Sequence, residues 1–599
     1  MIMRLLIRLC SVAVAMLLVS GSTLPLFAAE RPNVLLIMTD DQGWGDIAAH
    51  GAPELQTPVL DRLAAEGVQF DRFYVSPVCA PTRSSLLSGR YSLRTGVCGV
   101  TRGYENMRGS ELTIAECLRS AGYATGCFGK WHNGRHMPMH PNAQGFDEFV
   151  GFCGGHWNTY FDTPLEHNGE AIETSGYITD VITDAALQFI RDQKDTPWFC
   201  YVPYNAPHSP WRVPDEFFSK YADKGLDETA ACAYAMVECL DTNIGRLLSE
   251  LEQLQLDDDT LVLFLTDNGP NSARFNGGMR GTKGSVHEGG VRVPLFVKWG
   301  DRLKPHRVSQ IAAHIDLLPT ILAACGVEKP EGAPLDGASL WPLISEDDVA
   351  AAGWPDRILL TTRESETVES RKSLQGAARS QRWRATFEKG QWSLFDMATD
   401  PGQKTDVAAD HPTELKKLSA AWNAYIDGLL ADGFREPEVP VDAASGRVIE
   451  LPGNEAFLDS ATGGGIRYAG VNGFANCWVT DWTDAGATLR WNLDVVSPGR
   501  WEVVLEYAGS PDQAGSRLEI VCGESRREFV VQQSHNSPFV PVPERLIPSP
   551  HYSIRSWATQ PAGPVRLASG KQSLVLRGLR RPGRSFPEIK SVRLRRMDD

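Results

Sequence analysis

Short apolar runs alternate with helix-like segments along the first two-thirds of the chain. The runs at 34–38, 198–202 and 261–265 contain only apolar residues. The segments 113–121 and 229–251, which lie between such runs, have the character of helices. Buried strands that alternate with helices are typical of an α/β domain. We therefore expect an α/β fold with a largely parallel central sheet.

A helix is predicted to close this region. Apolar residues recur there at helical spacing, namely Leu415, Leu418, Trp422, Tyr425 and Leu429. Such a stripe is the pattern of a helix that packs on one side against a core.

The pattern then changes to that of short strands. After a linker-like segment at 436–440, apolar and polar residues alternate over 488–495, and a Ser-Pro-Gly-Arg turn signal precedes a second run at 501–507. Later runs of the same kind lie at 518–521, 573–576 and 591–595. Repeated short strands with turn signals predict a β-sandwich of about 150 residues.

The composition is that of a globular protein with an acidic balance. The 599 residues are 42% hydrophobic and 22% charged, and the formal net charge is −15. An acidic surface disfavours binding to phosphate backbones, so no nucleic-acid partner is expected. The 12 cysteines are scattered and show no Cys-x-x-Cys zinc pattern.

The N-terminus has the features of a signal peptide over residues 1–29. Arg4 and Arg8 precede an apolar stretch around 12–19, and Phe27-Ala28-Ala29 offers small residues for cleavage. The alternative is an uncleaved membrane anchor. No later stretch reaches about 18 consecutive apolar residues, so no stable membrane span is expected after cleavage. These features predict export to the periplasm or the extracellular space.

Two of the apolar runs end in acidic residues. The first run is followed by Asp40 and Asp41, and the third is followed by Asp267 and Asn268. Sites in open α/β sheets form beyond the carboxyl ends of the strands. Three carboxylates gathered there would repel one another without a cation, and oxygen ligands suit Ca²⁺ or Mg²⁺. The alternative for each residue is a loop cap or a turn.

A cysteine motif lies between these two strands. It begins Cys79-Ala-Pro-Thr-Arg83 and continues to a Leu-Leu-Ser-Gly-Arg stretch that ends at Arg90. Taken on its own, this motif predicts that Cys79 is a small core residue. A reactive cysteine at this position would benefit from nearby positive charge, which lowers the pKa of a thiol.

This motif and others in the same order resemble the type I, formylglycine-dependent sulfatases of the alkaline phosphatase-like superfamily. The other matching stretches are 32–41, 129–134, 207–210, 266–269, 281–290 and, for a strand of the small C-terminal subdomain, 394–401. The resemblance covers roughly residues 31 to 432. Asn133 departs from many relatives beside the histidine of the second stretch, which leaves the core chemistry undisturbed.

The resemblance implies that a maturation enzyme, as a partner, converts Cys79 to Cα-formylglycine. The hydrated aldehyde would attack sulfur with one hydroxyl, and the second hydroxyl would later expel sulfate by restoring the aldehyde. The resemblance also implies one Ca²⁺ per chain. Its ligands would be the residue at 79 together with Asp40, Asp41, Asp267 and Asn268.

The same resemblance implies roles for five further residues. Arg83 and Lys130 would hold the formylglycine and offset negative charge, and His132 would accept the proton of its second hydroxyl. His208 and Lys283 would bind the sulfate group, and one of them would help to protonate the departing alcohol.

These observations divide the chain into four parts. They are the signal peptide at 1–29, a catalytic domain with its small C-terminal subdomain at 30–435, a linker at 436–443 and the β-sandwich at 444–599. The expected activity is hydrolysis of a sulfate ester on a small molecule or a glycan. One alternative is a phosphodiesterase or phosphonate hydrolase of the same superfamily, and another is a glycan-binding protein that has lost catalysis.

The sequence identifies the substrate-contacting residues less clearly than the catalytic ones. The candidates that flank the motifs are His156, Trp157, Tyr160, Arg274 and His287. The alternative for each of them is ordinary packing or a position in a surface loop.

The sandwich resembles carbohydrate-binding modules in strand pattern alone. Trp478 and Trp482 are candidates to stack on sugar rings, or to lie in the core. From Lys571 onward there are nine Lys or Arg and three Asp or Glu. This excess suggests contact with an anionic polysaccharide or with the catalytic domain, and the alternative is a set of solvated strand faces.

Overall fold

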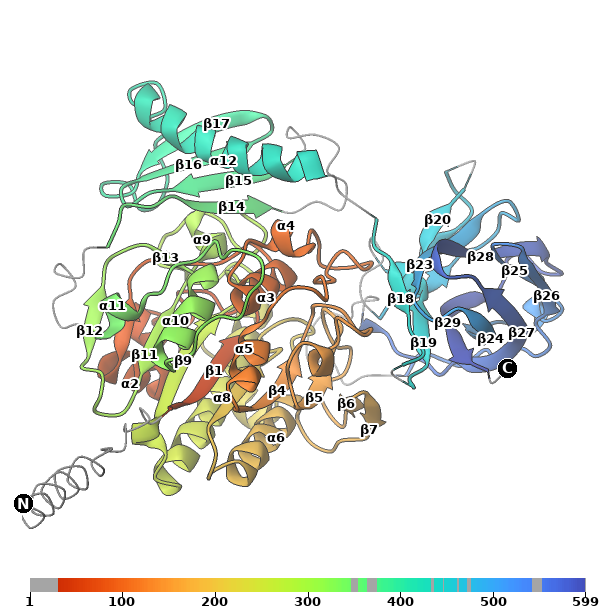
Figure 1. Cartoon of the computed structure of the whole chain (residues 1–599), viewed down its shortest axis with the longest axis horizontal. Helices are drawn as coiled ribbons and strands as arrows, with labels where there is room; N and C mark the ends of the chain where they lie inside the picture. The colour runs from red at the N-terminus through yellow and green to blue at the C-terminus, as the bar shows by residue number, and fades with distance from the viewer. Residues whose placement is uncertain are drawn as a thin grey trace, which may run out of the picture.

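The computed structural model describes residues 31–345, 354–363, 374–432, 436–444, 446–460, 463–470, 476–540 and 552–597. The predicted signal peptide at 1–29 lies outside the described residues. No helix within the described ranges combines the length and the hydropathy needed to cross a bilayer. Figure 1 shows a large α/β part and, on the right, an all-β part that contains the C-terminus.

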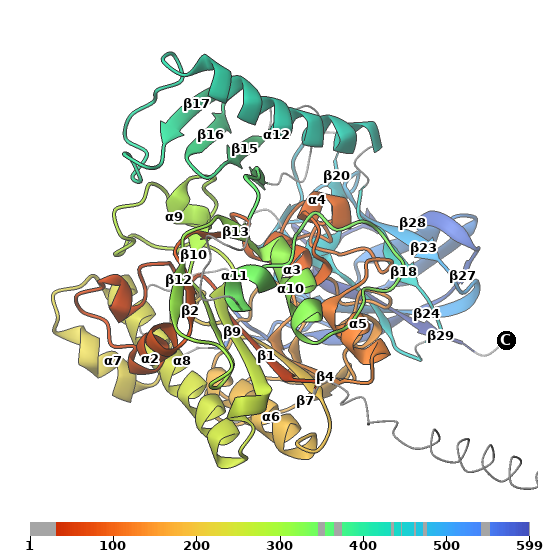
Figure 2. The same ribbon diagram turned by 60° about the vertical axis from the view of Figure 1, so that its left-hand side comes forward.

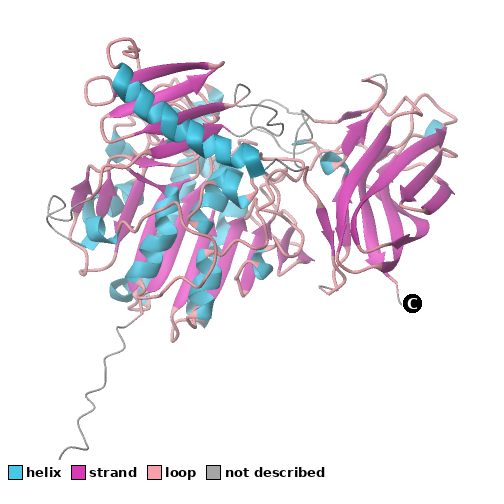
Figure 3. Cartoon of the chain, turned by 45° about the horizontal axis from the view of Figure 1, so that its top comes forward, coloured by secondary structure: helices cyan, strands magenta, loops and turns pink. Residues whose placement is uncertain are grey.

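A ten-stranded sheet forms the centre of the α/β part (Figures 1 and 3). Its strand order is β12-β2-β11-β9-β1-β8-β4-β5-β6-β7. The four middle strands are parallel, namely β9 (Thr260–Thr266), β1 (Asn33–Thr39), β8 (Trp198–Pro203) and β4 (Ala124–Lys130). The others are β12 (His306–Val308), β2 (Val68–Phe70), β11 (Leu295–Lys298), β5 (Glu148–Phe152), β6 (Leu165–His167) and β7 (Glu170–Ile172). The predicted α/β class is confirmed.

Helices cover both faces of this sheet. Leu35 and Ile37 of β1 belong to one apolar cluster and Leu36 and Met38 to another, because successive residues of a strand point to opposite faces. The first cluster includes α2 (Pro58–Glu66), α6 (Ile178–Asp192), α7 (Asp215–Ala222) and α8 (Glu228–Gln253). The second includes α3 (Cys79–Ser88), α5 (Ile114–Ser120) and α10 (Leu317–Ala324). In Figure 2, α3 and α10 lie above β1 and β9, and α6 and α8 lie below them.

Local sequence accounts for where two of these helices begin. The Asp227 carboxylate accepts hydrogen bonds from the first free backbone N–H groups of α8, and Thr113 and Glu116 form a capping box at the start of α5. Both devices satisfy donors that have no partner within the helix. The two helices correspond to the predicted segments 229–251 and 113–121.

A small antiparallel subdomain packs beside the main sheet. Its strands are β14 (Leu359–Arg363), β15 (Gln375–Arg379), β16 (Trp383–Glu388) and β17 (Gln391–Asp396), and α12 (Pro412–Asp432) lies across them. The buried Trp422 of α12 contacts the ring of Phe387, with 5.3 Å between ring centroids, and that of Trp392, with 5.6 Å. The helix predicted from the apolar stripe is therefore present.

Two six-stranded sheets form a sandwich around one apolar core in the C-terminal part. One contains β18 (Val439–Val441), β20 (Phe457–Asp459), β23 (Thr488–Val495), β25 (Arg517–Cys522), β26 (Ser525–Val530) and β28 (Gly570–Arg580). The other contains β19 (Ile449–Pro452), β21 (Arg467–Tyr468), β22 (Val479–Thr480), β24 (Gly499–Ala508), β27 (Ala558–Leu567) and β29 (Glu588–Arg596). The all-β prediction is confirmed.

The two candidate sugar-stacking tryptophans are buried. Trp482 is 0% exposed, and its indole N–H donates to the carbonyl of Asp484 over 3.0 Å. Trp478 is 5% exposed and packs against Trp557. Both positions match the core alternative.

Four of the nine basic residues near the C-terminus pair with acidic residues on neighbouring segments. These pairs are Lys571 with Glu438, Arg577 with Glu519, Arg593 with Glu506 and Arg595 with Glu502. Four of the nine basic residues from Lys571 onward are therefore paired on the strand faces of this part of the chain.

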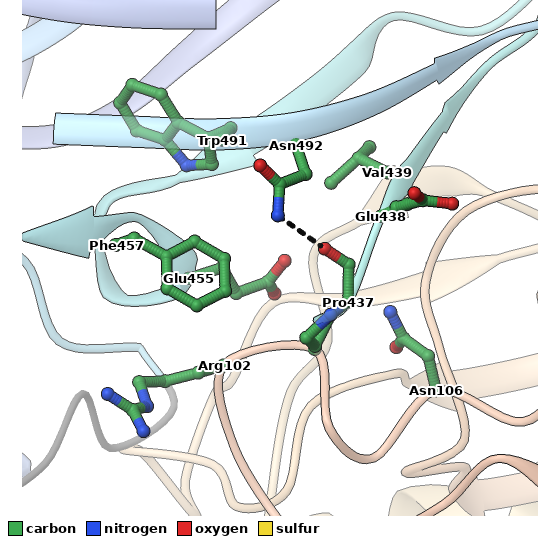
Figure 4. A pocket seen from close by; sticks show the side chains of 10 residues that line it. Arg102, Asn106, Pro437, Glu438, Val439, Glu455, Phe457, Trp491 and Asn492 are labelled. Carbon is green, nitrogen blue, oxygen red and sulfur yellow. Dashed lines mark hydrogen bonds between the residues drawn. The ribbon is translucent and has the colours of Figure 1, made fainter. Parts of the chain in front are cut away.

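The segment expected to be a linker, 436–443, includes part of the sandwich. It contains β18, which pairs in parallel with β23 and buries Val439 and Val441 in the core. Figure 4 shows a small pocket at this junction, lined by Arg102 and Asn106 of the α/β part and by residues of the sandwich. The amide of Asn492 donates to the carbonyl of Pro437 over 3.5 Å there.

Candidate active site

The acidic ends of β1 and β9 meet at one edge of the sheet. The two strands are adjacent and parallel, with Thr39 opposite Thr266. Asp267 Oδ1 accepts a hydrogen bond from the Asp41 backbone N–H over 3.1 Å, and the Asn268 amide donates to Asp41 Oδ1 over 2.7 Å. Asp40 lies beside them, and all four side chains are buried.

Cys79 stands at the first position of α3 and faces this cluster. Its Sγ, a carboxylate oxygen of Asp40 and one of Asp267 all lie within 4.8 Å of one another. Burial raises the pKa of the thiol, although Lys130 and Lys283 act in the opposite direction. The unmodified residue is therefore a buried thiol rather than a reactive thiolate.

Two buried cations bridge the strands beneath Cys79. Arg83 donates to Asp267 Oδ2 and, from Nη1 over 2.7 Å, to the carbonyl of Lys130. The Lys130 ammonium lies 2.5 Å from Asp40 Oδ2. Burial alone would lower the pKa of Arg83, but Asp267 and Asp40 raise it above its ordinary value. Arg83 therefore stays protonated beside these carboxylates.

A third cation lies nearer to solvent. Lys283 Nζ is 2.6 Å from Asp41 Oδ1, and its side chain is 22% exposed. Burial would lower the pKa of Lys283, but Asp41 raises it above its ordinary value. Three cations thus face three carboxylates in this cluster.

The donor set fits a hard divalent cation. Among the described residues, Asp40 Oδ1, Asp41 Oδ2 and Asn268 Oδ1 are buried and have no hydrogen-bond partner. Burying such oxygens without a partner is costly, and carboxylate and amide oxygens are the ligands that Ca²⁺ takes. Asp41 also adopts a φ of 65°, in the left-handed region that non-glycine residues rarely use.

The two predicted histidines are held as neutral rings. His132 Nε2 lies 2.9 Å from the carbonyl of Val100, so Nε2 carries the proton and Nδ1 is an acceptor, one with no partner among the described residues. Burial and then Lys130 lower the pKa of His132. His208 Nδ1 lies 2.5 Å from the carbonyl of Ser209, and its Nε2 lies 3.7 Å from Asp41 Oδ2. Burial and Lys283 lower the pKa of His208 to about 3.

The structure therefore brings the predicted residues to one edge of the sheet. They are Asp40, Asp41, Cys79, Arg83, Lys130, His132, His208, Asp267, Asn268 and Lys283. Their chemical roles stay predictions.

Two of the candidate substrate-contact residues, His156 and Tyr160, lie next to His208. His156 lies beside His208, and the Tyr160 hydroxyl donates to the His208 carbonyl over 2.8 Å. Trp157 stacks on Phe152, a residue of β5.

Arg274 and His287 instead pair with carboxylates that lie outside the cluster. The Arg274 guanidinium pairs with the buried Asp46 and donates to the Asp41 carbonyl, so it supports the loop after β1. His287 Nε2 lies 2.9 Å from a Glu388 carboxylate oxygen, at the contact with the small subdomain.

Sequence reasoning missed one residue at this site. Tyr552 of the C-terminal part places its hydroxyl 2.6 Å from Ser209 Oγ, next to His208. No local pattern distinguishes this tyrosine from the others in the sandwich.

Comparisons with known proteins agree with the fold and the site. Residues 32–327 match the family model described as Sulfatase, and residues 282–424 match the model described as N-sulphoglucosamine sulphohydrolase, C-terminal. Both matches end before the β-sandwich.

Two curated relatives and one solved structure illustrate the similarity. N-acetylgalactosamine-6-sulfatase of Mus musculus is 30% identical over 68% of this chain and 82% of that protein. Arylsulfatase A of Homo sapiens is 33% identical over 53% of this chain and 69% of that protein. The crystal structure of Ps i-CgsB in complex with k-i-k-neocarrahexaose is 30% identical, with a TM-score of 0.60, and the match covers 66% of this chain and 92% of that one. The chain therefore belongs to the sulfatase family and is a sulfuric ester hydrolase.

Proposed function

We propose that this chain is an exported sulfatase that removes sulfate from a carbohydrate, with Cys79 converted to formylglycine and one Ca²⁺ bound beside it. The observation that supports it best is the position of Cys79 Sγ within 4.8 Å of carboxylate oxygens of Asp40 and Asp267. Asp40, Asp41, Asp267 and Asn268 would hold the cation. Hydrated formylglycine supplies a nucleophile for sulfur that can release sulfate by returning to the aldehyde, and the cation supplies positive charge for the sulfate oxygens.

The deeper residues position the nucleophile and balance its charge. Arg83 is fixed by three hydrogen bonds to Asp267 and to the Lys130 carbonyl, so its charge stays in one place. Lys130 is fixed by Asp40 in the same way. Charges that are already oriented cost no reorganisation during the reaction.

The two histidines and Lys283 would transfer protons and bind the sulfate group. The partner-free Nδ1 of His132 is suited to accept the proton of the second hydroxyl. His208 and Lys283 lie nearer to solvent and would hold the sulfate group, and one of them would protonate the departing alcohol.

The carbohydrate substrate is proposed from relatives. One relative is named N-acetylgalactosamine-6-sulfatase, and the solved structure of another is a complex with k-i-k-neocarrahexaose. Export would follow from the signal peptide at 1–29 and would bring the chain to extracellular or periplasmic glycans. The maturation enzyme would act on the motif that begins at Cys79.

The experiment has two parts. Trypsin should release residues 73–83, and their mass should report an aldehyde in place of the Cys79 thiol after expression with a formylglycine-generating enzyme. The purified enzyme is then assayed on N-acetylgalactosamine 6-sulfate and on a neocarrahexaose. It is also assayed on one aryl alcohol presented as its sulfate, as a phosphate diester and as a phosphonate ester, which separates a sulfatase from a phosphodiesterase or phosphonate hydrolase.

Cys79→Ala should abolish turnover. Cys117→Ala removes another buried cysteine, in α5, and should leave turnover unchanged. Turnover by the Cys79→Ala chain, or faster cleavage of the phosphate diester or the phosphonate ester, would contradict the proposal.

A further inference from the structure

The side chains of Lys283 and His208 lie nearer to solvent than those at the base of the candidate site. The charged side chains at its base, such as Arg83 and Lys130, are 0% exposed. Those of His208 and Lys283 are 8% and 22% exposed. We therefore expect a sulfate ester to enter from the side of these two residues, with its alcohol part outermost.

Two largely buried aromatic rings lie beside His208, namely His156, which is 2% exposed, and Tyr552 of the C-terminal sandwich, which is 8% exposed. The imidazoles of His156 and His208 are parallel, with 6.3 Å between centroids and 2° between planes. The Tyr552 ring meets His156 edge-on, with 5.4 Å between centroids and an angle of 87°. Lys283 and Asp41 are both near enough to affect the pKa of the Tyr552 phenol, which burial raises.

Hydrogen bonds fix the sandwich at this position. The Tyr552 hydroxyl lies 2.6 Å from Ser209 Oγ, and the amide of Asn158 donates to the carbonyl of Ser553 over 3.3 Å. On the far side of His156, the amide of Asn476 donates to the His156 carbonyl over 2.9 Å. The loop that carries His156 is thus held from two separate segments of the sandwich.

Asn476 is itself anchored within the sandwich. Its carbonyl accepts a hydrogen bond of 2.7 Å from the ammonium of Lys590 in β29. The contact with the His156 loop is therefore continuous with the sandwich sheet rather than with an isolated loop.

The chemistry of the His156 and Tyr552 rings suits a sugar. Saccharide rings carry apolar C–H faces, which pack on aromatic rings, and hydroxyls, which pair with polar tips such as a phenol. We propose that the sugar bearing the sulfate binds beside the loop that carries His156 and contacts the 8%-exposed side chain of Tyr552, so that the C-terminal sandwich completes the active site and Tyr552 selects the saccharide. This inference rests on the proposed function, since it takes the substrate to be a sulfated carbohydrate.

The test measures binding, so that it does not depend on turnover. In the full-length Cys79→Ala chain with Ca²⁺, calorimetry gives the affinities for inorganic sulfate and for whichever of N-acetylgalactosamine 6-sulfate and neocarrahexaose binds more tightly. The variants added to this background are Tyr552→Ala, Tyr552→Phe and the control Phe539→Ala. Phe539 is an aromatic residue of the sandwich, 52% exposed, that packs on Trp478.

Tyr552→Ala should weaken saccharide binding by about tenfold or more and leave inorganic sulfate within about twofold. Tyr552→Phe keeps the ring and loses the contact with Ser209, so it should weaken saccharide binding by a smaller factor, and it serves as the test if the alanine variant does not fold. Phe539→Ala should change neither affinity.

Three results would overturn the inference. They are unchanged saccharide affinity in both Tyr552 variants, an equal loss for saccharide and inorganic sulfate, and binding of inorganic sulfate without any saccharide binding in the parent. Failure of the proposed function would appear separately, as absent turnover by the matured wild-type enzyme.

Discussion

Arg83 donates two hydrogen bonds to a single carboxylate oxygen of Asp267, from Nε over 3.2 Å and from Nη2 over 2.9 Å. Both side chains are 0% exposed. Arg83→Lys keeps one positive charge but cannot reproduce this fork or the further bond to the Lys130 carbonyl. We expect a loss of about 2–4 kcal/mol in the free energy of unfolding, measured by urea denaturation, together with a loss of sulfatase activity.

A matched control is available on the surface. Arg382 also donates from Nε and Nη2 to one carboxylate, but to the two different oxygens of Asp396, over 3.0 Å and 2.7 Å, and its side chain is 58% exposed. Arg382→Lys should barely change stability, because water replaces the lost contact. Equal losses in the two variants would show that burial does not set the strength of the Arg83–Asp267 pair.

Removal of the divalent ion should destabilise the catalytic domain. Asp40 Oδ1, Asp41 Oδ2 and Asn268 Oδ1 are buried acceptors with no partner among the described residues, so a bound Ca²⁺ would satisfy all three. Ca²⁺ at about 100 times its dissociation constant should add about 2.7 kcal/mol of stability, visible as a rise in Tm after prior treatment with a chelator.

Two variants test whether the stabilisation by Ca²⁺ depends on the assigned ligands. Asn268→Ala should abolish most of the Ca²⁺-dependent rise in Tm. Asn492→Ala removes an amide at the junction with the sandwich and should leave the rise intact. A wild-type Tm that does not respond to Ca²⁺ would argue against the assigned ligands.

Continuous apolar runs made much of the fold and the ion site predictable. The runs that became β1 and β9 are buried along their whole length, and each ends in Thr-Asp. Parallel strands bring such ends to the same edge, which is why Asp41 and Asp267 are in contact. The family motifs then added Cys79, Arg83 and Lys130 at that edge.

Contacts between remote segments were not predictable in the same way. Tyr552 reaches Ser209 across 343 positions of sequence, and no periodicity encodes such a distance. Arg274 lies near the motifs, yet it pairs with Asp46, because a buried carboxylate there needs a partner. The segment 436–443 was predicted to be a linker although it contains β18. This strand has three residues, which is too short for an alternating pattern to be recognised.

His132 provides a kinetic prediction. The Val100 carbonyl fixes its tautomer and leaves Nδ1 as an acceptor, so His132→Ala removes a positioned base. We expect kcat to fall by about 10²–10⁴-fold, with binding of inorganic sulfate unchanged. His167→Ala alters a histidine at the end of β6 whose side chain is 48% exposed, and kcat should stay at the wild-type level. A wild-type kcat for His132→Ala would show that His132 is not the catalytic base.

Glu455 makes the stability of the domain junction depend on pH. It belongs to the sandwich and lies 3.5 Å from Arg135 of the α/β part, which also pairs with Glu450. Burial raises the pKa of Glu455 to about 7; Arg135 opposes this shift, and Glu105 and Glu450 add to it. The folded chain therefore keeps a proton that the unfolded chain loses above its ordinary pKa of 4.5, so stability falls as pH rises from about 4.5 to about 7 and then levels off.

Glu455→Gln should remove this dependence because the amide does not titrate. Relative to wild type, the variant should gain stability as pH rises, by about 2–3 kcal/mol between pH 5 and pH 8, as measured by urea denaturation at each pH. Glu524→Gln on an exposed turn of the sandwich provides the control and should follow the wild-type profile. If the difference between Glu455→Gln and wild type were constant over this range, Glu455 would already be ionised in the folded chain, and Arg135 would outweigh its burial.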